Sequence, residues 1–416
     1  MLHLLYNLSI TIYAGLITIV SPWYKKARLW VEGRDRIFER LSEAISPDDK
    51  VIWMHDASLG EFEQGRPILE QIRQRYPEYK ILVTFFSPSG YEIRKDYEGA
   101  DYVFYLPSDT PSNARRFMDI VHPQMAIFVK YEFWINYLSE LKRRGVCSYL
   151  VSAIFRQDSV FFRFYGSMWR KALDAFDYMF VQNEQSRELL HSIGFDNVIV
   201  AGDTRFDRVA SIAQSIPQIP IVEAFKGDKP LFVAGSTWGP DEQILQSLIN
   251  ANTDIKFIVA PHEMDPTRIE RIIGATEAGA VRYTACDETT DFSDKQVLVL
   301  DTIGILSSIY RYASWAYIGG GFGVGIHNTL EAATFGLPMA FGPKYDKFKE
   351  ARDMVALGVA TSVTSAEQLK QWFEPLRDNK AHLAVLSAAA KDYTARNQGA
   401  TELFMKIAFK DYPARR

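Results

Sequence analysis

Short apolar runs alternate with helical segments along most of this 416-residue chain, and this alternation constrains the fold most. The helical segments are about a dozen residues long, which suffices for the crossover that joins two parallel strands. The pattern therefore predicts one doubly wound parallel sheet in each half of the chain. The strands are expected at residues 50–55, 80–86, 101–106, 125–129, 147–151 and 178–181, and then at 230–234, 256–260, 297–300, 313–318 and 338–341.

Two domains are also the default expectation for a chain of this length. The break is expected where Pro217, Pro220 and a Lys-Gly-Asp-Lys-Pro run interrupt the alternation. The last helix is free to pack back on the first domain. The expected parts are a membrane-attachment helix over residues 1–21, a Rossmann-like domain over 22–207, a linker over 208–228 and a second Rossmann-like domain over 229–416.

Composition excludes several classes of protein. A net charge of −4 argues against bulk binding of nucleic acid. The two cysteines, Cys147 and Cys286, supply neither a disulfide framework nor a metal-ligand spacing, which fits a reducing compartment. The seven histidines are scattered, without a His-Glu-x-x-His or a paired His/Cys motif, so we expect no metal site and no cofactor.

The N-terminal segment is apolar enough to meet a membrane. Residues 2–20 contain no Asp, Glu, Lys or Arg, and the segment is about as long as a bilayer-spanning helix. The aromatic residues Trp23 and Tyr24 and then the cations Lys25 and Lys26 follow, which places the body of the protein on the cytoplasmic side. A cleaved signal peptide fits poorly, because there is no basic n-region and no Ala-x-Ala site. A buried or interfacial helix of the first domain is the alternative, and spanning and interfacial placement both stay open.

Polar residues follow the expected strands of the first domain. Ser58, Gly60 and Glu61 stand at the helix entrance after the first strand, and Lys130 and Glu132 follow the fourth strand. Ligands of parallel α/β sheets bind outside the carboxyl ends of the strands, so these residues are expected to share one site. The helix dipole would keep Glu61 ionised and ready to accept a proton from a hydroxyl group. A glutamate that merely starts a helix is the alternative.

The second domain carries a glycine-rich stretch between a strand and a helix, Tyr317-Ile-Gly-Gly-Gly-Phe-Gly-Val-Gly-Ile-His-Asn-Thr-Leu-Glu331. Glycines such as Gly320 and Gly321 allow a positive φ and a close approach of a ligand to the backbone, and a helix start suits an anion. The stretch matches neither the Gly-x-Gly-x-x-Gly fingerprint of dinucleotide-binding proteins nor the Gly-x-x-x-x-Gly-Lys-Ser/Thr loop that binds nucleoside triphosphates. Asn328 and Glu331 stand at capping-box spacing, so a purely structural turn is the alternative.

Residues 155–170 interleave Arg156, Arg163 and Arg170 with six aromatic side chains. This mixture suits a surface that meets lipid head groups and phosphates. An amphipathic helix whose aromatic residues fill the core is the alternative.

Two Rossmann-like domains with polar strand ends predict a cleft enzyme. The expected fold class is α/β, with two doubly wound domains facing a cleft in the GT-B architecture of glycosyltransferases, and with an N-terminal apolar membrane-attachment helix. The second domain would bind a nucleotide-activated donor and the first would bind the acceptor. These patterns do not name the sugar.

The collected residues resemble, in order along nearly the whole chain, the 3-deoxy-D-manno-octulosonic acid (Kdo) transferases of lipopolysaccharide synthesis. The matching pieces of the first half are Ser58-Leu-Gly-Glu61, Ser87-Pro-Ser-Gly90, Glu132-Phe-Trp134 with Asn136, Gln182-Asn-Glu184 and Gly202-Asp-Thr-Arg-Phe-Asp207. Those of the second half are Gly235-Ser-Thr237, Pro261-His-Glu263, Asp301-Thr302 with Gly304, Gly319-Gly-Gly321 and Gly325-Ile-His-Asn-Thr-Leu-Glu331.

The resemblance implies an inverting transfer of Kdo from CMP-Kdo to a lipid A precursor, lipid IVA, at the cytoplasmic face of the inner membrane. It implies that Glu61 is the general base and that the N–H groups of the glycine loop stabilise the charge of the leaving CMP. The implied partners are CMP-Kdo, the lipid A precursor and a membrane lipid surface, and no nucleic acid. The implied donor-binding residues are Ser236, Thr237, His262, Gly320, Gly321, Asn328 and Glu331, and the acceptor-binding residues are Ser58, Gly60, Lys130, Glu132 and Arg156.

The chain departs from the family pattern in the donor half. The family commonly has Pro-Arg-His-Pro-Glu-Arg where this chain reads Pro261-His-Glu-Met-Asp-Pro266, so Arg268 or a lysine is expected to supply the charge of the replaced arginine. Two other functions stay open: a GT-B enzyme that uses a UDP-sugar, and a non-catalytic membrane-attached binding protein of the same fold.

Overall fold

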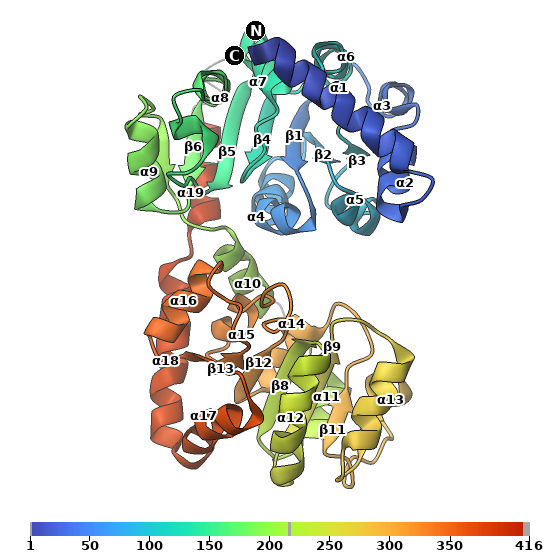
Figure 1. Ribbon diagram of the computed structural model, residues 1–416, viewed down its shortest axis with the longest axis vertical. Helices are drawn as coiled ribbons and strands as arrows, with labels where there is room; N and C mark the ends of the chain where they lie inside the picture. The colour runs from blue at the N-terminus through green and yellow to red at the C-terminus, as the bar shows by residue number, and fades with distance from the viewer. Residues whose placement is uncertain (1, 215–217, 411–416) are drawn as a thin grey trace. The chain divides into compact units, whose positions relative to one another are not determined.

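The computed structural model describes residues 2–214 and 218–410, which form two compact units (Figure 1). The first unit comprises Met1–Arg208 and Gln398–Arg416, and the second comprises Val209–Asn397. Each unit is built around one seven-stranded parallel sheet. The two doubly wound sheets and the apolar N-terminal helix that the sequence predicts are confirmed.

The sheet of the first unit has the strand order β3-β2-β1-β4-β5-β6-β7. Its central strands are almost continuously apolar, as expected when helices cover both faces of a sheet. The strands are β1 (Val51–Asp56), β2 (Lys80–Phe85), β3 (Tyr102–Tyr105), β4 (Met125–Val129), β5 (Cys147–Ala153), β6 (Tyr178–Val181) and β7 (Val198–Val200).

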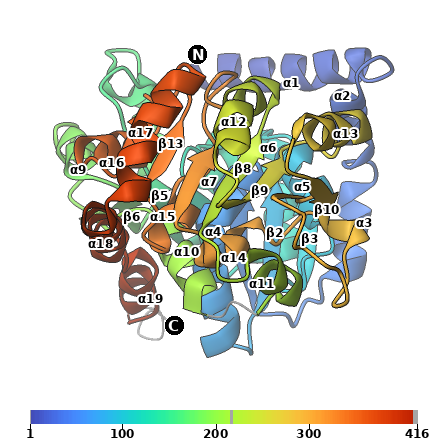
Figure 2. The same cartoon turned by 90° about the horizontal axis from the view of Figure 1, so that it is seen from below.

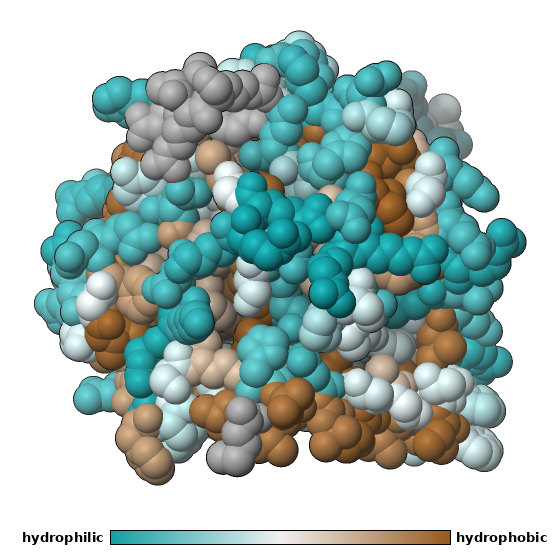
Figure 3. Space-filling view, turned by 90° about the horizontal axis from the view of Figure 1, so that it is seen from above, coloured by the Kyte–Doolittle hydropathy of each residue, from teal (hydrophilic) through white to brown (hydrophobic). Residues whose placement is uncertain are grey.

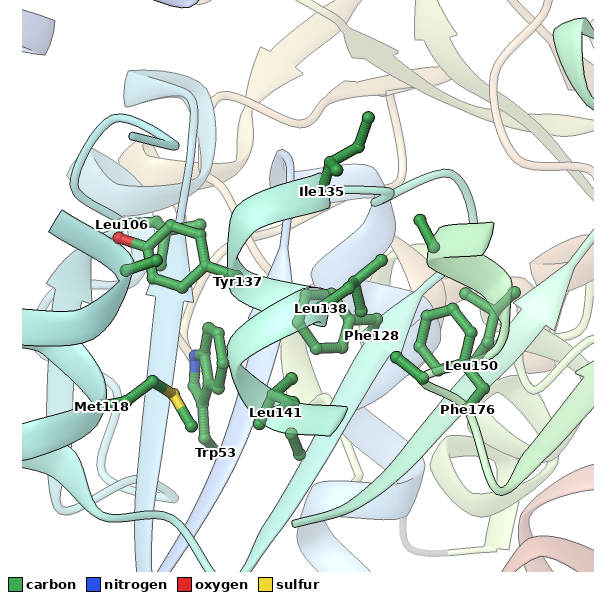
Figure 4. Packing of buried hydrophobic residues seen from close by; sticks show 14 of the residues in the cluster. Trp53, Leu106, Met118, Phe128, Ile135, Tyr137, Leu138, Leu141, Leu150 and Phe176 are labelled. Atoms are coloured by element: carbon green, nitrogen blue, oxygen red, sulfur yellow. The ribbon is translucent and has the colours of Figure 1, made fainter. Parts of the chain in front are cut away.

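Two hydrophobic layers hold the helices of this unit against its sheet. One layer surrounds Trp53, Phe128 and Tyr137, which Figure 4 shows packed together, and it joins α3, α6, α7 and α8 to the sheet. The other layer, around Phe62 and Phe404, joins α4 and α19 to the opposite face. The helices are α2 (Lys25–Glu32), α3 (Ile37–Ala44), α4 (Leu59–Arg75), α5 (Pro88–Arg94), α6 (Pro111–Val121), α7 (Ile135–Arg144), α8 (Ser167–Leu173), α9 (Glu184–His191) and α19 (Ala400–Lys410), with a 3₁₀ turn at Val160–Phe162.

Side chains in both halves of the N-terminal helix α1 (Leu2–Val20) contact the rest of the first unit. The Tyr6 hydroxyl donates a hydrogen bond to Asp109 at 2.6 Å. The Tyr13 ring lies 6.2 Å from the Phe86 ring, measured between ring centres. Figures 1 and 2 show α1 running along this unit beside α2.

The outer side of α1 is apolar and exposed. By length and composition, α1 could cross a membrane. Figure 3 shows a band of hydrophobic side chains along one margin of the molecule. Exposed apolar residues on and after the helix include Leu4, Leu5, Leu8, Ile12, Leu16, Ile19, Trp23 and Tyr24. An apolar band of this kind is consistent with association with a membrane.

The sheet of the second unit has the strand order β10-β11-β9-β8-β12-β13-β14. The strands are β8 (Leu231–Thr237), β9 (Lys256–Pro261), β10 (Ala280–Arg282), β11 (Val297–Val299), β12 (Trp315–Ile318), β13 (Met339–Phe341) and β14 (Ala360–Ser362). The helices are α11 (Pro220–Lys226), α12 (Gly239–Ala251), α13 (Pro266–Ala275), α14 (Leu306–Ile309), α15 (Leu330–Thr334), α16 (Lys349–Ala356), α17 (Ala366–Asp378) and α18 (Lys380–Arg396), with 3₁₀ turns at Tyr283–Ala285 and Tyr310–Tyr312.

Two features differ from the sequence pattern. The outer strands β7, β10 and β14 have three residues each, which is too short a run for the pattern to distinguish from a loop. The segment 208–228 contains α11 and most of α10 (Arg205–Gln214), while Pro217 lies outside the described residues. Pro220 stands in the first turn of α11. Proline has no backbone N–H, and an N–H at this position would have no hydrogen-bond partner within the helix.

The chain leaves the first unit after Arg208 and re-enters it at Gln398. The Asp207 side chain bonds the two segments together. Its carboxylate accepts hydrogen bonds from the backbone N–H of Gly399 at 2.6 Å and of Thr401 at 2.7 Å, at the start of α19. Helix α19 then packs by stacking Phe409 on Tyr76, with 4.2 Å between ring centres. Asp207 thus satisfies two backbone donors that the start of a helix leaves open.

We expect Asp207→Ala to loosen α19, because loss of a side-chain cap costs about 0.5–2 kcal/mol. Hydrogen exchange across residues 400–410 should become faster, and the melting temperature should fall. Asp196→Ala is the matched control, since Asp196 is an exposed acid of the same unit. Equal exchange of α19 in both variants would contradict this role of Asp207.

Candidate active site

The first unit reverses its strand order between β1 and β4. The chain moves outward from β1 to β2 and β3, and then returns to the other side of β1 as β4. Ligands of doubly wound sheets bind at such a switch point, outside the carboxyl ends of the two strands. The loop and helix start after β1 carry Ser58, Gly60 and Glu61, and the loop after β4 carries Lys130 and Glu132. The topology therefore brings these five residues to one edge of the sheet.

Glu61 is an oriented carboxylate in the first turn of α4. The hydroxyl of Ser58, the residue before the helix, donates a hydrogen bond to this carboxylate. Because Glu61 is only partly buried, a ligand can reach it.

Tyr131 connects Glu61 electrostatically with the cations of the site. Burial raises the pKa of the Tyr131 hydroxyl, the Arg156 guanidinium lowers it, and the Glu61 carboxylate raises it. The Lys130 ammonium lies 5.5 Å from the centre of the Tyr131 ring. Lys130 and Arg156 are thus two cations near Tyr131, and such cations form charge-assisted hydrogen bonds with phosphate groups.

Glu132 is held by its neighbours. It is buried, and its Oε2 accepts a hydrogen bond from the Trp134 indole at 2.7 Å and lies 3.1 Å from Nε2 of His55. His55 is in turn anchored to Thr84, with 2.9 Å between Nδ1 and the hydroxyl oxygen. This network fixes the loop that presents Lys130, whose φ of +69° is unusual for a residue with a side chain.

The last residue of β1, Asp56, is a further carboxyl group in this region. The sequence pattern assigns no role to it. It is fully buried, and neither of its carboxyl oxygens has a hydrogen-bond partner among the described residues. Helix α4 passes close to it, because a Cβ on Gly65 would lie 3.0 Å from Oδ1 of Asp56. Burial raises the pKa of Asp56 well above its ordinary value, and the charges of Glu61 and Glu132 raise it further. These effects favour the protonated form of Asp56 relative to an aspartate in water.

The second unit reverses its strand order between β8 and β12. The end of β8 carries Ser236 and Thr237, and the glycine-rich stretch follows β12. The two segments touch so closely that a Cβ on Gly319 would lie 2.1 Å from the carbonyl oxygen of Ser236. Only glycine permits this contact, which brings Ser236 and Thr237 beside Gly320 and Gly321.

Asp241 holds the glycine-rich stretch in place. This buried side chain accepts hydrogen bonds from the Tyr317 hydroxyl at 2.8 Å, from the Gly320 N–H at 2.9 Å and from the Trp238 N–H at 2.8 Å. The Gly320 N–H is therefore already bonded to a carboxylate. Gly320 is needed for its φ of +92°.

Two histidines stack beside this stretch. The rings of His262 and His327 lie 4.3 Å apart, and Trp238 lies 4.9 Å from His262. The Trp238 indole donates to Nε2 of His327 at 3.2 Å, so a neutral His327 carries its proton on Nδ1. Burial lowers the pKa of His327 to about 4, and the nearby His262 lowers it as well. His327 is therefore a neutral N–H donor next to the exposed His262.

Asn328 and Glu331 bond to each other. The Asn328 side-chain amide donates to Glu331 at 2.9 Å, and its oxygen accepts the Leu330 N–H at 3.1 Å. The helix that follows, α15, spans Leu330–Thr334. The pair is thus part of the helix start, and both side chains are only partly buried.

Arg268 supports the end of β8. Its guanidinium donates to Glu242 at 2.6 Å and to the Thr237 carbonyl at 2.6 Å, and the side chain is buried. Its charge is thus paired with Glu242, which fits a structural role better than an open contact with a donor phosphate.

The Arg–aromatic stretch divides between core and surface. Phe155 and Phe161 are buried in the layer around Trp53, whereas Phe164 is 94% exposed. Arg170 donates to the carbonyl of Phe161 at 2.8 Å, which holds the loop together. The aromatic residues of this stretch are therefore partly core and partly surface residues, and its contact with lipid head groups stays a prediction.

Solved structures of similar fold define the class of protein. The UDP-GlcNAc 2-epimerase from Neisseria meningitidis, solved bound to UDP-GlcNAc, aligns with 87% of this chain and 100% of its own, with a TM-score of 0.61 and 15% identity. A calicheamicin glycosyltransferase aligns with 88% of this chain and 99% of its own, with a TM-score of 0.55 and 10% identity. The fold is the GT-B fold that the sequence predicts.

Sequence comparison finds relatives of this chain. Residues 35–208 match the family model of 3-deoxy-D-manno-octulosonic-acid transferase (kdotransferase). The transferase of that name from Haemophilus influenzae is 25% identical over 95% of this chain and 93% of its own, and that from Bordetella pertussis is 27% identical over 93% of this chain and 95% of its own. The chain is therefore similar to Kdo transferases over nearly its whole length, and these relatives indicate a glycosyltransferase.

The buried Asp56 generates a prediction about pH. Its pKa is raised in the folded state, so folding retains a proton that the unfolded chain loses above the ordinary pKa of aspartate, near 4. Stability is therefore lost as the pH rises, by about 1.4 kcal/mol per unit, until the folded-state pKa is reached. We expect Asp56→Asn to melt at least about 3 °C above the parent protein at pH 8, with the difference closing towards pH 4.

Thermal unfolding at a series of pH values measures this difference. Asp96→Asn serves as the control, because Asp96 is an exposed acid of the same unit. A pH-independent difference between Asp56→Asn and the parent would show that Asp56 is not kept protonated by folding.

Proposed function

We propose that this enzyme transfers Kdo from CMP-Kdo to a lipid A precursor, lipid IVA, at the cytoplasmic face of the inner membrane. Similarity to Kdo transferases supports the transferred sugar. The observation that carries the proposal is the oriented Glu61 carboxylate at the switch point of the first unit, with the Ser58 hydroxyl bonded to it.

In this mechanism Glu61 is the general base. An acceptor hydroxyl attacks the anomeric carbon of Kdo, the bond from that carbon to the phosphate oxygen of CMP breaks, and the hydroxyl proton passes to Glu61. Attack opposite the leaving group inverts the anomeric configuration. A positioned base contributes roughly 10²–10⁴-fold to the rate. The hydrogen bond from Ser58 holds the carboxylate in one orientation.

The acceptor is assigned to the switch point of the first unit. Lys130 and Arg156 would bind its phosphate groups through charge-assisted hydrogen bonds. Gly60, which is exposed at the helix start, leaves room beside Glu61. Glu132 would act by fixing the loop of Lys130 through Trp134 and His55.

The donor is assigned to the switch point of the second unit. Ser236 and Thr237 at the end of β8 and the exposed His262 would receive the phosphate, while Gly320 and Gly321 allow a close approach to the backbone. His327 would add a neutral N–H donor. The donor's ribose hydroxyls are assigned to Asn328 and Glu331, whose present hydrogen bond a sugar hydroxyl could replace on either side.

Release of CMP from CMP-Kdo, measured with a lipid A precursor in detergent, tests the proposal. The parent protein should show acceptor-dependent release, and Glu61→Gln should lose about 10²–10⁴-fold in kcat while it still binds CMP-Kdo. Glu63→Gln is the matched control from the same helix, because Glu63 is paired with Arg94 at 2.7 Å. It should keep its turnover within a few-fold.

Each other outcome has a definite meaning. Equal turnover of the parent and Glu61→Gln would remove Glu61 from the mechanism. No release by folded parent protein, with turnover of a UDP-sugar instead, would replace the donor. Donor binding without any turnover would favour a non-catalytic binding protein of this fold.

We further propose that α1 lies in the plane of the membrane. Its fastening to the first unit through Tyr6 and Tyr13 would be lost if the helix turned to span the bilayer. A spanning α1 would place the N-terminus outside the cytoplasm, whereas an in-plane helix keeps it inside.

A cleavable tag at the N-terminus distinguishes these placements in cells. We expect external protease to leave this tag intact on spheroplasts and to remove it only after lysis. A C-terminal tag on the same protein is the control for the integrity of the inner membrane. Cleavage of the N-terminal tag alone on intact spheroplasts would show that α1 spans the bilayer.

A further inference from the structure

An apolar pocket of about 330 Å³ lies between α1, the start of α2 and the turn from β2 to α5. Ile17 and Val20 of α1, Ala27 of α2 and the aromatic rings of Trp30 and Phe86 line it. The proposed reaction uses none of these residues. Deep apolar concavities in folded proteins are ordinarily binding sites for apolar groups.

The walls of the pocket are fixed by packing and hydrogen bonds. The Trp30 ring lies 6.1 Å from Phe86, and Tyr13 closes the space between them at 6.2 Å from Phe86. Arg34 stacks 3.9 Å above Trp30 and donates to the carbonyl of Phe86 at 2.9 Å. A pocket with such walls loses little conformational entropy when it is filled.

Cations stand at the rim of this pocket. Lys26 lines it, and Lys25 and Arg28 are exposed on the same turns of α2. None of the three forms an ion pair with another residue of the described chain. An apolar slot beside unpaired cations complements an amphiphile that has an anionic head and a hydrocarbon chain.

The pocket connects the exposed apolar band with the proposed acceptor site. On one side it reaches Val20 and Tyr24, which belong to the band of α1. On the other side the Phe86 ring lies 4.8 Å from Trp134, whose indole donates to Glu132 in the loop of Lys130. A chain in the pocket would therefore extend from the membrane side towards the acceptor head group.

We propose that this pocket holds one acyl chain of the phosphorylated lipid acceptor while the cations at its rim bind the acceptor's head group. The inference rests on the proposed function, because it assigns part of the same acceptor. The pocket would then contribute to acceptor specificity by binding the hydrocarbon chain rather than the sugar.

Ala27→Trp tests this assignment by filling the pocket from its α2 wall. The acceptor KM of the variant is compared for the acylated precursor and for the same precursor with its ester-linked and amide-linked acyl chains removed. We expect KM for the acylated acceptor to rise about tenfold or more, since excluding two methylenes already corresponds to that factor. KM for the deacylated acceptor should stay within about twofold.

Leu16→Trp is the matched control. Leu16 is an exposed residue of α1 outside the pocket, so the variant should keep both KM values and its attachment to vesicles. An unchanged ratio of the two KM values in Ala27→Trp, or an equal rise in both variants, would overturn the proposal.

A second measurement uses the unaltered enzyme and is independent of how the variant folds. An acceptor with a diazirine at the end of one acyl chain is irradiated on the protein, and the labelled peptides are identified. Labels on residues 13–30 or 86–88 support the pocket, and labels elsewhere overturn it. Equal labelling by a diazirine phospholipid that the acceptor does not displace would show a bilayer lipid as the occupant, and would likewise overturn it.

Failure of the inference and failure of the proposed function are distinguishable. If the parent protein releases CMP in the presence of acceptor but the ratio of KM values does not change, only the acyl-chain pocket is wrong. If the parent releases no CMP with either acceptor, the Kdo transfer itself is wrong.

Discussion

Parallel strands can be joined only by crossovers, and this constraint decides where chemistry can take place in the molecule. A chain that builds its sheet outward in both directions must start twice from the middle, so two loops diverge there and leave a crevice. Both units have this arrangement, between β1 and β4 and between β8 and β12. Glu61 and Lys130 face one crevice from opposite loops, and Ser236 and Gly321 belong to the two segments that flank the other.

The sequence predicts this framework well because the framework depends on local patterns. Apolar runs of five or six residues mark the central strands, and the polar residues that follow them lie at the switch points. Contacts between distant segments leave no such pattern. The hydrogen bonds that Asp241 accepts from Tyr317 and Gly320, and the bond from Trp238 to His327, join residues 76 to 89 positions apart. The only signals for them were an acid at a helix start and a histidine within a motif.

Both candidate sites contain features that lower the stability of the fold and that the fold alone would not require. Lys130 and Ser236 are two of the few described residues with a side chain and a positive φ, and one lies at each switch point. Asp56 brings a carboxyl group without hydrogen-bond partners next to Glu61. Strain and buried polar groups persist where the surrounding structure compensates for them, and such places are often functional. In the first unit the compensation comes from two continuous apolar layers around its sheet.

The fastening of α1 has a practical consequence for preparing this protein. An apolar N-terminal helix is a common target for truncation when a soluble fragment is wanted. In this chain the helix covers Trp30 and Phe86 through Tyr13, and it supplies the hydroxyl that bonds to the buried Asp109. Truncation would therefore exchange one exposed apolar surface for another and leave a carboxylate without one of its donors. A detergent or a lipid disc that covers the helix is better matched to this fold than removal of the helix.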